Sequence, residues 1–289
     1  MEDILTADSF WEEFSPLTKE RPKAFPRREQ ISVYEQLDST NAELLRRMEA
    51  ASALRDVDGS LTADGRNLHL SVVVAASQTA GRGRVGRSFY SPEGTGIYFS
   101  LLYAPRGGVK DPAAYTVTAA VGVCRAIEAL YGVQAQIKWV NDVYVHSRKV
   151  CGILTEGFSR PGTGIVEAAI IGIGINIVVD ETKFPSDAAA KAGGILDGGR
   201  IEGLSRARLL ARAVKETLAP LAAGEDVVPE YRRRSLLLGK KVMVSPLAGT
   251  ADERYEAEAI AVTDDAGLLV ELADGSRRVL RSGEVTLHL

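Results

Sequence analysis

Three arginines alternate with three glycines in one short segment of the chain, Gly81-Arg82-Gly83-Arg84-Val85-Gly86-Arg87. Glycine lets the backbone adopt positive φ and come close to a ligand, whereas arginine offers a planar pair of N–H groups that matches carboxylate or phosphate oxygens. Residue types in this order are suited to holding an anion. We therefore expect a flexible loop that clamps a phosphate or a carboxylate.

The spacing of these glycines also satisfies the G-x-G-x-x-G pattern of dinucleotide-binding turns. That motif requires a helix that begins at the glycines and directs its N-terminus at the pyrophosphate. Here the chain continues instead through the polar residues 91–96 into a strand-like run at 97–103. A loop between two strands is a different arrangement, so we exclude a dinucleotide-binding turn.

Two lysines and one aspartate form a second group suited to chemistry. Lys138 and Asp142 belong to the run Lys-Trp-Val-Asn-Asp, and Lys149 follows within one hairpin length. Lysine ammonium groups supply point charges to phosphate oxygens, and a carboxylate oxygen can bind Mg²⁺. This group is therefore suited to neutralising a polyphosphate, and neither lysine needs to act as a base.

A third segment, residues 172–177, reads Gly-Ile-Gly-Ile-Asn-Ile. Its glycines leave space for a ligand to approach a strand closely. Asn176 lies among isoleucines, where a buried amide needs a hydrogen-bonding partner. This segment is a third candidate for contact with a ligand.

The composition is that of an ordinary enzyme, with 289 residues, 45% hydrophobic and 25% charged, and a formal net charge of −3. This charge provides no global basic field for non-specific binding of DNA or RNA. The longest apolar run, 168–179, is too short to span a membrane, and the three scattered histidines indicate no structural zinc site. Two cysteines without C-x-x-C spacing and an acidic N-terminal segment indicate a cytoplasmic protein.

Hydrophobic periodicity predicts one large domain and one small one. Residues 1–30 are rich in proline and charge, and we expect an irregular arm. Thr40 and Glu43 have capping-box spacing ahead of a helix at 42–50, and the polar residues 51–67 are expected to be a surface excursion. Further strands are predicted at 31–37, 70–75, 97–103, 135–139, 142–145, 149–157 and 166–179, and further helices at 112–132, 204–221 and 228–238.

The pattern changes after Lys240. Short alternating strands are predicted at 241–245, 255–262, 268–272 and 278–281, linked by turns rich in aspartate and glycine. About fifty residues of short strands suggest a small β-barrel.

At these residues the chain resembles the biotin protein ligases, of the biotin–[acetyl-CoA-carboxylase] ligase type. Five motifs occur in the order and approximate spacing of that family, and the resemblance covers nearly everything from Ile31 onward. The motifs lie at 38–41, 78–87, 138–142, 149–154 and 172–176. The resemblance implies an α+β catalytic domain over 31–236, with a mixed sheet and helices similar to class II aminoacyl-tRNA synthetases and lipoate ligases. It also implies an SH3-like C-terminal domain over 237–289.

The resemblance further implies which residues bind each ligand. Its biotin-binding residues would be Ser39, Thr40, Asn41, Gln78, Arg82, Gly83, Arg84 and Lys149. Its ATP-binding or adenylate-binding residues would be Arg84, Arg87, Phe89, Lys138, Asn141, Asp142 and Asn176. Mg²⁺ would meet Asp142 and Asn176, and Lys149 and Arg84 would be catalytic.

The activity implied by the resemblance has two steps. Biotin and MgATP give biotinoyl-AMP and pyrophosphate, and a lysine of a biotin carboxyl carrier domain then takes the biotinoyl group and releases AMP. The acceptor would belong to an acetyl-CoA or pyruvate carboxylase. A glycine-rich loop that orders over the mixed anhydride would exclude water from it.

Three departures from the family pattern bear on these expectations. Val140 stands where the family has proline, and Phe89 stands where a related bacterial enzyme carries tryptophan against the adenine. No helix-turn-helix module fits before Ile31, so we expect no DNA partner and no repressor activity. The enzyme is expected to be a monomer or a homodimer and to have no membrane partner.

Each motif taken alone has an ordinary structural interpretation, because serine and threonine cap helices and arginine is common on surfaces. The conjunction of the motifs supports the functional interpretation. Two other functions stay open from the sequence. One is a lipoate or octanoyl transferase of the same superfamily, and the other is a biotin-binding sensor that has lost turnover.

Overall fold

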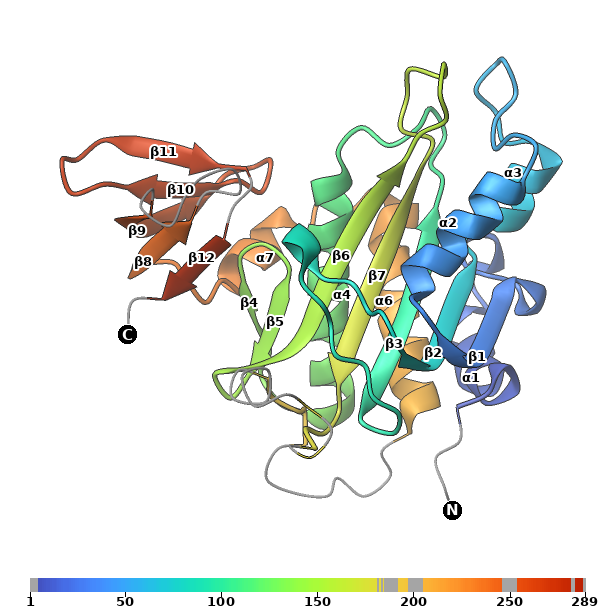
Figure 1. The fold of residues 1–289 in the computed structure, drawn as a ribbon, viewed down its shortest axis with the longest axis horizontal. Coiled ribbons are helices and arrows are strands. Elements are labelled where there is room, and N and C mark those ends of the chain that lie inside the picture. Colours follow the sequence, from blue (N-terminus) through green and yellow to red (C-terminus); the bar gives the residue numbers. More distant parts are fainter. Residues whose placement is uncertain are drawn as a thin grey trace.

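The computed structural model describes residues 5–180, 182, 184, 192–196, 205–245, 254–281 and 284–287 of the chain. Its strands form two sheets (Figure 1), of order β1-β2-β3-β7-β6-β5-β4 and β11-β10-β9-β8-β12. The large sheet contains β1 (Ile31–Leu37), β2 (Val72–Gln78), β3 (Gly96–Tyr103), β4 (Gln136–Lys138), β5 (Asp142–Val145), β6 (Arg148–Phe158) and β7 (Ala168–Asn176). The α-helices are α1 (Ala7–Phe14), α2 (Thr40–Ala50), α3 (Ala63–Leu68), α4 (Pro112–Tyr131), α6 (Arg206–Ala223) and α7 (Val228–Arg233).

The large sheet is mixed, as the resemblance implied. β1 and β2 pair in parallel, whereas every other neighbouring pair is antiparallel. The long strands β3, β7 and β6 lie at its centre, and short strands β5 and β4 form one edge. The predicted helices at 112–132 and 204–221 are confirmed as α4 and α6.

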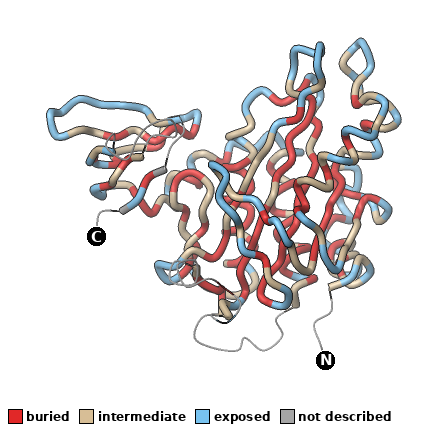
Figure 2. The backbone as a smooth tube through the Cα atoms, viewed as in Figure 1, coloured by how far each residue is buried: buried red, intermediate tan, exposed pale blue. Residues whose placement is uncertain are grey.

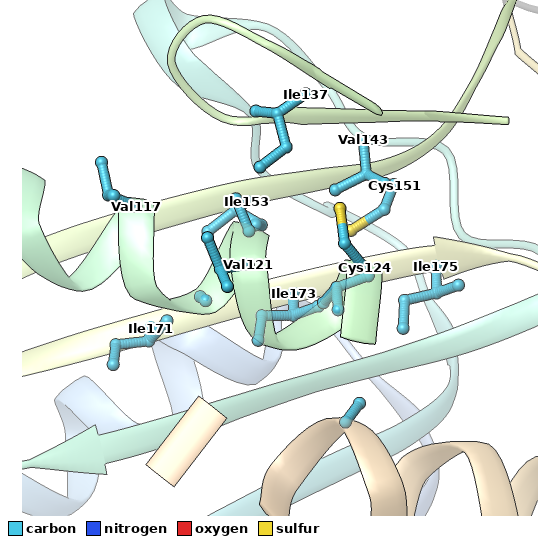
Figure 3. Packing of buried hydrophobic residues seen from close by; sticks show 14 of the residues in the cluster. Val117, Val121, Cys124, Ile137, Val143, Cys151, Ile153, Ile171, Ile173 and Ile175 are labelled. Atoms are coloured by element: carbon cyan, nitrogen blue, oxygen red, sulfur yellow. The ribbon is translucent and has the colours of Figure 1, made fainter. Parts of the chain in front are cut away.

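Side chains alternate between the two faces of β7, because successive residues of a strand point to opposite sides. The isoleucines of its second half, at 171, 173 and 175, lie on the face covered by α4 and α6, where they pack with Ile153 of β6 and Val121 of α4 (Figure 3). Burial of each such aliphatic side chain stabilises the fold by about 1.5–3 kcal/mol. This face holds the main hydrophobic core, seen as the buried interior in Figure 2.

The opposite face of the sheet is only partly covered. Helix α2 packs over one end through Leu44 and Met48, which contact a second cluster that includes Leu102 and Ile170. Further along the same face the strands carry Gly172 and other glycines in place of large side chains. This uncovered part of the sheet is where the candidate site lies.

Helix α4 is long and apolar enough to suit a membrane span by length and hydropathy. It begins at Pro112 after the N-cap Asp111, whose Oδ1 accepts the Ala113 N–H at 2.9 Å. Nearly all its residues from Thr116 to Ile127 are buried between the sheet and α6. Its apolar composition is therefore explained by its place in the core.

The first thirty residues differ from the irregular arm that we expected. They contain helix α1, which starts with a capping box between Thr6 and Ser9 at 2.9 and 3.0 Å. Phe10 and Phe14 stack with their ring centroids 5.0 Å apart, are fully buried, and bring α1 against α6. The prolines that suggested an irregular arm lie after this helix. Likewise, the predicted surface excursion at 51–67 contains most of α3.

The C-terminal strands β8 (Lys240–Ser245), β9 (Tyr255–Val262), β10 (Leu268–Glu271), β11 (Arg277–Leu280) and β12 (Glu284–Leu287) form a small antiparallel β domain. It lies beside α7 and the β4–β5 edge (Figure 1). Trp139 Nε1–H donates to Ala266 O at 2.9 Å, and Arg232 Nε–H donates to Val262 O at 2.8 Å. The strand β12 was missed from the sequence. The SH3-like form of this domain and the boundaries at 31 and 237 stay predictions.

His69 lies away from the candidate site, at the C-cap of α3. Its Nδ1 accepts the Ala104 N–H at 3.1 Å, and its ring lies 5.2 Å from the Tyr103 ring. Burial, together with the nearby Arg55 guanidinium, lowers the pKa of His69 to about 4. The native chain therefore keeps this imidazole neutral at pH values where an exposed histidine is charged.

This depressed pKa predicts a loss of stability in acid. Between pH 6.5 and 4 the unfolded chain binds a proton at position 69 that the native chain does not. The free energy of unfolding therefore decreases by about 1–3 kcal/mol as the pH is lowered through this range. Urea unfolding at pH 7 and pH 4.5 measures the effect. His69→Gln keeps an acceptor for Ala104 but does not titrate, and should lose this part of the pH dependence; an equal dependence in both proteins would contradict the assignment.

Candidate functional site

A cavity opens on the part of the large sheet that α2 leaves uncovered. Its volume is about 160 Å³, and its mouth is open to solvent. Thirteen of the fourteen residues predicted from the sequence line it: Ser39, Thr40, Asn41, Gln78, Arg82, Gly83, Arg84, Arg87, Phe89, Lys138, Asn141, Asp142 and Lys149. The structure thus brings together residues that belong to four separate motifs.

Glycines form the floor of the cavity. Side chains from other elements lie directly against the sheet here and leave no room for a Cβ atom. Gly152 of β6 pairs with Gly174 of β7, and the ring of Phe89 covers both of them. A Cβ atom at Gly174 would lie 2.3 Å from Phe89 Cε1, and one at Gly172 would lie 2.3 Å from Asn41 Oδ1. The predicted close approach at these glycines is therefore made, in this structure, by the chain's own Phe89 and Asn41.

The segment expected to be a flexible Arg-Gly loop is a short hairpin. The Phe89 N–H donates to Gly81 O at 2.8 Å, and the Gly83 N–H donates to Arg87 O at 2.7 Å. Val85 and Gly86 at its tip have φ of 58° and 71°, as in the type I′ turns that join antiparallel strands. Glycine adopts this conformation readily, but a β-branched valine there is strained.

An uncharged polar wall forms one side of the cavity. Gln78 Oε1 accepts the Thr40 N–H at 2.8 Å and lies 3.2 Å from the Thr40 hydroxyl. The predicted capping box is wrong, because Ser39 is the N-cap of α2 and makes no side-chain cap bond. Thr40 instead turns inward to Gln78, and Glu43 pairs with arginines of its own helix.

A charged wall forms another side of the cavity, around strand β5. Lys149 Nζ lies 2.7 Å from Asp142 Oδ1, and both side chains are partly exposed to the cavity. Arg84 Nη1–H donates to Asn141 Oδ1 at 3.2 Å, and Asn141 Nδ2–H donates to Ile153 O at 3.0 Å. Arginine and lysine nitrogens therefore face the same space as the amide and hydroxyl groups of the polar wall.

Tyr98 lies beneath this arrangement and is fully buried. Its hydroxyl donates to Pro92 O at 3.0 Å, and its ring meets Phe89 edge-on at 6.3 Å. Burial raises the pKa of Tyr98 to about 12, so the phenol stays protonated near neutral pH. It supports the segment that leads out of the Arg-Gly hairpin.

Ligands for a divalent metal are sparse in the described part of the chain, which holds no group of three or more histidine, cysteine, aspartate or glutamate side chains suited to a metal. Asn176, the one predicted site residue that does not line the cavity, lies two residues beyond Gly174 on β7. Among the residues that the structure describes, its buried Oδ1 finds no hydrogen-bond partner. Such an oxygen, with the Asp142 carboxylate, fits Mg²⁺, which commonly takes one or two protein oxygens and fills its shell with water and phosphate oxygens.

Several residues of the site were missed from the sequence. Ser91, Ser100 and Glu156 bind the polar wall from behind, and Val285 of the small β domain lines the cavity. Glu156 carried a weak signal, as a charge near the end of a buried strand. Val285 carried none, because its strand was not predicted.

Comparison with known proteins agrees with this geometry. The model of the biotin/lipoate A/B protein ligase family matches residues 65–176. A biotin–[acetyl-CoA-carboxylase] ligase of Mycobacterium tuberculosis is 30% identical over 90% of this chain and 89% of its own length. The chain belongs to the biotin/lipoate A/B protein ligase family. The resemblance and the fold class predicted from the motifs are therefore confirmed.

Other relatives extend the comparison. The bifunctional ligase/repressor BirA of Bacillus subtilis is 30% identical over 72% of this chain, and the chain covers only 64% of that protein's length. A biotin protein ligase from Aquifex aeolicus, solved in complex with biotin and ATP, superposes with a TM-score of 0.68 at 23% identity. That match covers 89% of this chain and 98% of the other, and supports the fold.

The contact between Phe89 and the glycine floor predicts a strong packing effect. Gly174→Ala should displace the Phe89 ring and lower the free energy of unfolding by about 1–3 kcal/mol, because the new Cβ would overlap that ring. Phe89→Leu in the same chain should recover part of this loss. Urea unfolding of both single variants and the double variant measures the coupling, and strictly additive losses would argue against the contact.

Proposed function

We propose that the chain is an ATP-dependent biotin protein ligase, which activates biotin as biotinoyl-5′-AMP and transfers it to a lysine of a biotin carboxyl carrier protein. The observation that carries this proposal is the assembly of the polar wall and the charged wall around one cavity. Two anionic substrates and one uncharged bicyclic ring require such a combination. The names of the relatives from M. tuberculosis and Paracoccus denitrificans support the same activity.

In the proposed complex, the ureido ring of biotin binds the polar wall formed by Ser39, Thr40, Asn41 and Gln78. The valeryl chain then runs over the floor toward Arg84 and Lys149. Arg82 and Gly83 of the hairpin cover the ligand. This direction follows the order of the floor, in which Asn41 covers Gly172 while Asp142 pairs with Gly152.

ATP would bind at the charged wall with Arg84, Arg87, Lys138, Asn141 and Asp142. A carboxylate oxygen of biotin attacks the α-phosphorus, a new P–O bond forms, and the bond to the β-phosphate oxygen breaks to release pyrophosphate. Both reactants are anions, so preorganised cations at this wall offset their repulsion and hold them in line. Lys149 is the proposed principal catalytic residue, and its contact with Asp142 fixes its ammonium group in the cavity.

Mg²⁺ would be held by Asp142 and Asn176, and when bound it neutralises phosphate charge. Phe89 is proposed to offer an aromatic surface to the adenine, with a smaller area than tryptophan has. In the second step the acceptor lysine amine attacks the acyl carbon, an amide bond forms, and AMP leaves with the electrons of the broken anhydride bond. The Arg-Gly hairpin would shelter the anhydride from water between these steps.

The proposed acceptor is a biotin carboxyl carrier domain of acetyl-CoA or pyruvate carboxylase. The small β domain takes part in the proposed site, because Val285 lines the cavity and Ala266 O binds Trp139. We propose a cytoplasmic monomer or homodimer that acts without DNA or membrane partners and without repressor activity.

Lys149→Ala tests the catalytic assignment. Biotin-dependent release of pyrophosphate from MgATP should fall about 10²–10³-fold, as expected when one preorganised cation is removed from the transition state. The exposed Lys110 offers a matched control, and Lys110→Ala should leave the rate unchanged. A wild-type protein that binds biotin but releases no pyrophosphate would be a sensor, whereas incorporation of lipoate instead of biotin into a carrier domain would identify the alternative transferase.

Arg84→Ala tests the shelter proposed for the anhydride. The variant should release biotinoyl-AMP into solution and label unrelated lysine-containing proteins, because Arg84 would no longer hold the adenylate phosphate beneath the hairpin. Arg106→Ala, at an exposed arginine, is the control. Chromatography of the released adenylate and blotting of a bystander protein measure the leak; equal retention in all three proteins would contradict this role.

A further inference from the structure

Glu156 lies on β6 behind the polar wall and does not line the main cavity. Its two carboxylate oxygens have different partners. Oε1 accepts from Arg82 Nη2 at 2.8 Å, and Oε2 accepts from Asn41 Nδ2 at 2.7 Å. Glu156 therefore connects the Arg-Gly hairpin to the beginning of α2, two elements that both contribute to the proposed biotin site.

The contacts continue from Asn41 into the buried interior. Ser100 Oγ–H donates to Asn41 Oδ1 at 2.6 Å, and Ser100 Oγ also lies 2.7 Å from the Thr40 hydroxyl oxygen. Ser100 is fully buried, and Asn41 and Thr40 are only 3% and 4% exposed, so these groups have little access to water. Unsatisfied partners would therefore be costly here.

The far end of the same network returns to the hairpin segment. Thr40 contacts Gln78 Oε1, Gln78 Nε2–H donates to Ser91 Oγ at 2.8 Å, and the Ser91 hydroxyl donates to Phe89 O at 3.0 Å. Arg82 and Ser91 stand on either side of the hairpin tip. The network thus links both strands of the hairpin to one polar wall.

The donors and acceptors of this network can be assigned by counting protons. The amide hydrogens of Asn41 face Glu156, so its carbonyl oxygen faces Ser100 and must receive that serine's single proton. Ser100 then has only lone pairs for Thr40, whose hydroxyl proton turns toward it. This assignment leaves no proton between Thr40 Oγ1 and Gln78 Oε1, which lie 3.2 Å apart. Both oxygens are therefore acceptors at the cavity, which suits a ligand that presents N–H groups.

We propose that Glu156 is a positioning residue for biotin: its carboxylate orients Asn41, and through it the acceptors of the polar wall, while it holds Arg82 against β6. This inference rests on the proposed function. A carboxylate suits the position because both of its partners are donors. Glutamine would offer only one oxygen, so one of its partners, Arg82 or Asn41, would face an N–H group.

The same reasoning predicts that a paired exchange restores the network. In Asn41→Asp/Glu156→Gln, the glutamine oxygen accepts from Arg82 and its amide group donates to the new aspartate, whose second oxygen still accepts from Ser100. Asn41→Asp alone instead places two carboxylates in contact. Each single variant therefore disturbs the wall, whereas the double variant restores the contacts with Arg82, Ser100 and residue 156 and loses only the longer bond from Asn41 Nδ2 to Leu154 O, at 3.4 Å.

Titration calorimetry with biotin tests this proposal, with pyrophosphate release measured in parallel. Glu156→Gln and Asn41→Asp should each weaken biotin binding about 10–100-fold, the range expected for one unmatched buried polar contact. The double variant should return to within about threefold of wild type, and the KM for ATP should change less than about twofold in Glu156→Gln. Glu271→Gln is the control, because Glu271 also pairs with an arginine at 2.8 Å from a strand but does not line the cavity.

Thermal unfolding of each variant separates binding from folding. Wild-type affinity in Glu156→Gln, or no recovery in a folded double variant, would overturn the role of Glu156 while leaving the ligase proposal intact. Failure of the wild-type protein to bind biotin would overturn the proposed function and this inference together. Recovery in the double variant, together with an unchanged KM for ATP in Glu156→Gln, supports the inference even where the single variants are less stable, because a loss of fold would impair ATP binding as well.

Discussion

The alternation of isoleucine and glycine along β7 is the constraint on which the site depends. On one face the isoleucines fill the core beneath α4, and on the other the glycines leave a bare strand on which Phe89 and Asn41 lie. Both requirements fall on the same short segment, because adjacent residues of a strand serve opposite faces. A register shift of one residue would exchange the two surfaces and would place isoleucine side chains in the cavity.

Charge is distributed across the site in a way that suits the proposed chemistry. The chain carries a formal net charge of −3, whereas lysine and arginine side chains gather at the cavity. Asp142 and Asn141 hold Lys149 and Arg84 in the described structure. These contacts order long, flexible side chains before a ligand binds. Less side-chain entropy is then lost on binding, so the entropic cost of binding is lower.

Much of this arrangement could be predicted from the sequence, and the exceptions have physical causes. The motifs at 81–87 and 138–149 identified the cavity because glycine, arginine and lysine are informative as residue types. Helix α1 was missed because eight residues give too short a periodic signal beside three prolines. Thr40 was misassigned because capping-box spacing is local, whereas its actual partners, Gln78 and Ser100, lie far away in sequence. Glu156 and Val285 depend on tertiary contacts that no spacing reveals.

The cavity draws its lining from Ser39 to Val285, so nearly the whole chain must be in place before the site exists. Strand β12 pairs with β8, and the small β domain meets the turn between β4 and β5 through Trp139. The wall that includes Val285 therefore depends on long-range contacts. Contacts of this kind form late, because closing large loops costs entropy before any packing is gained. During synthesis, all strands of the large sheet are made before β12, so the cavity lacks the wall that Val285 supplies until the last residues of the small β domain are in place.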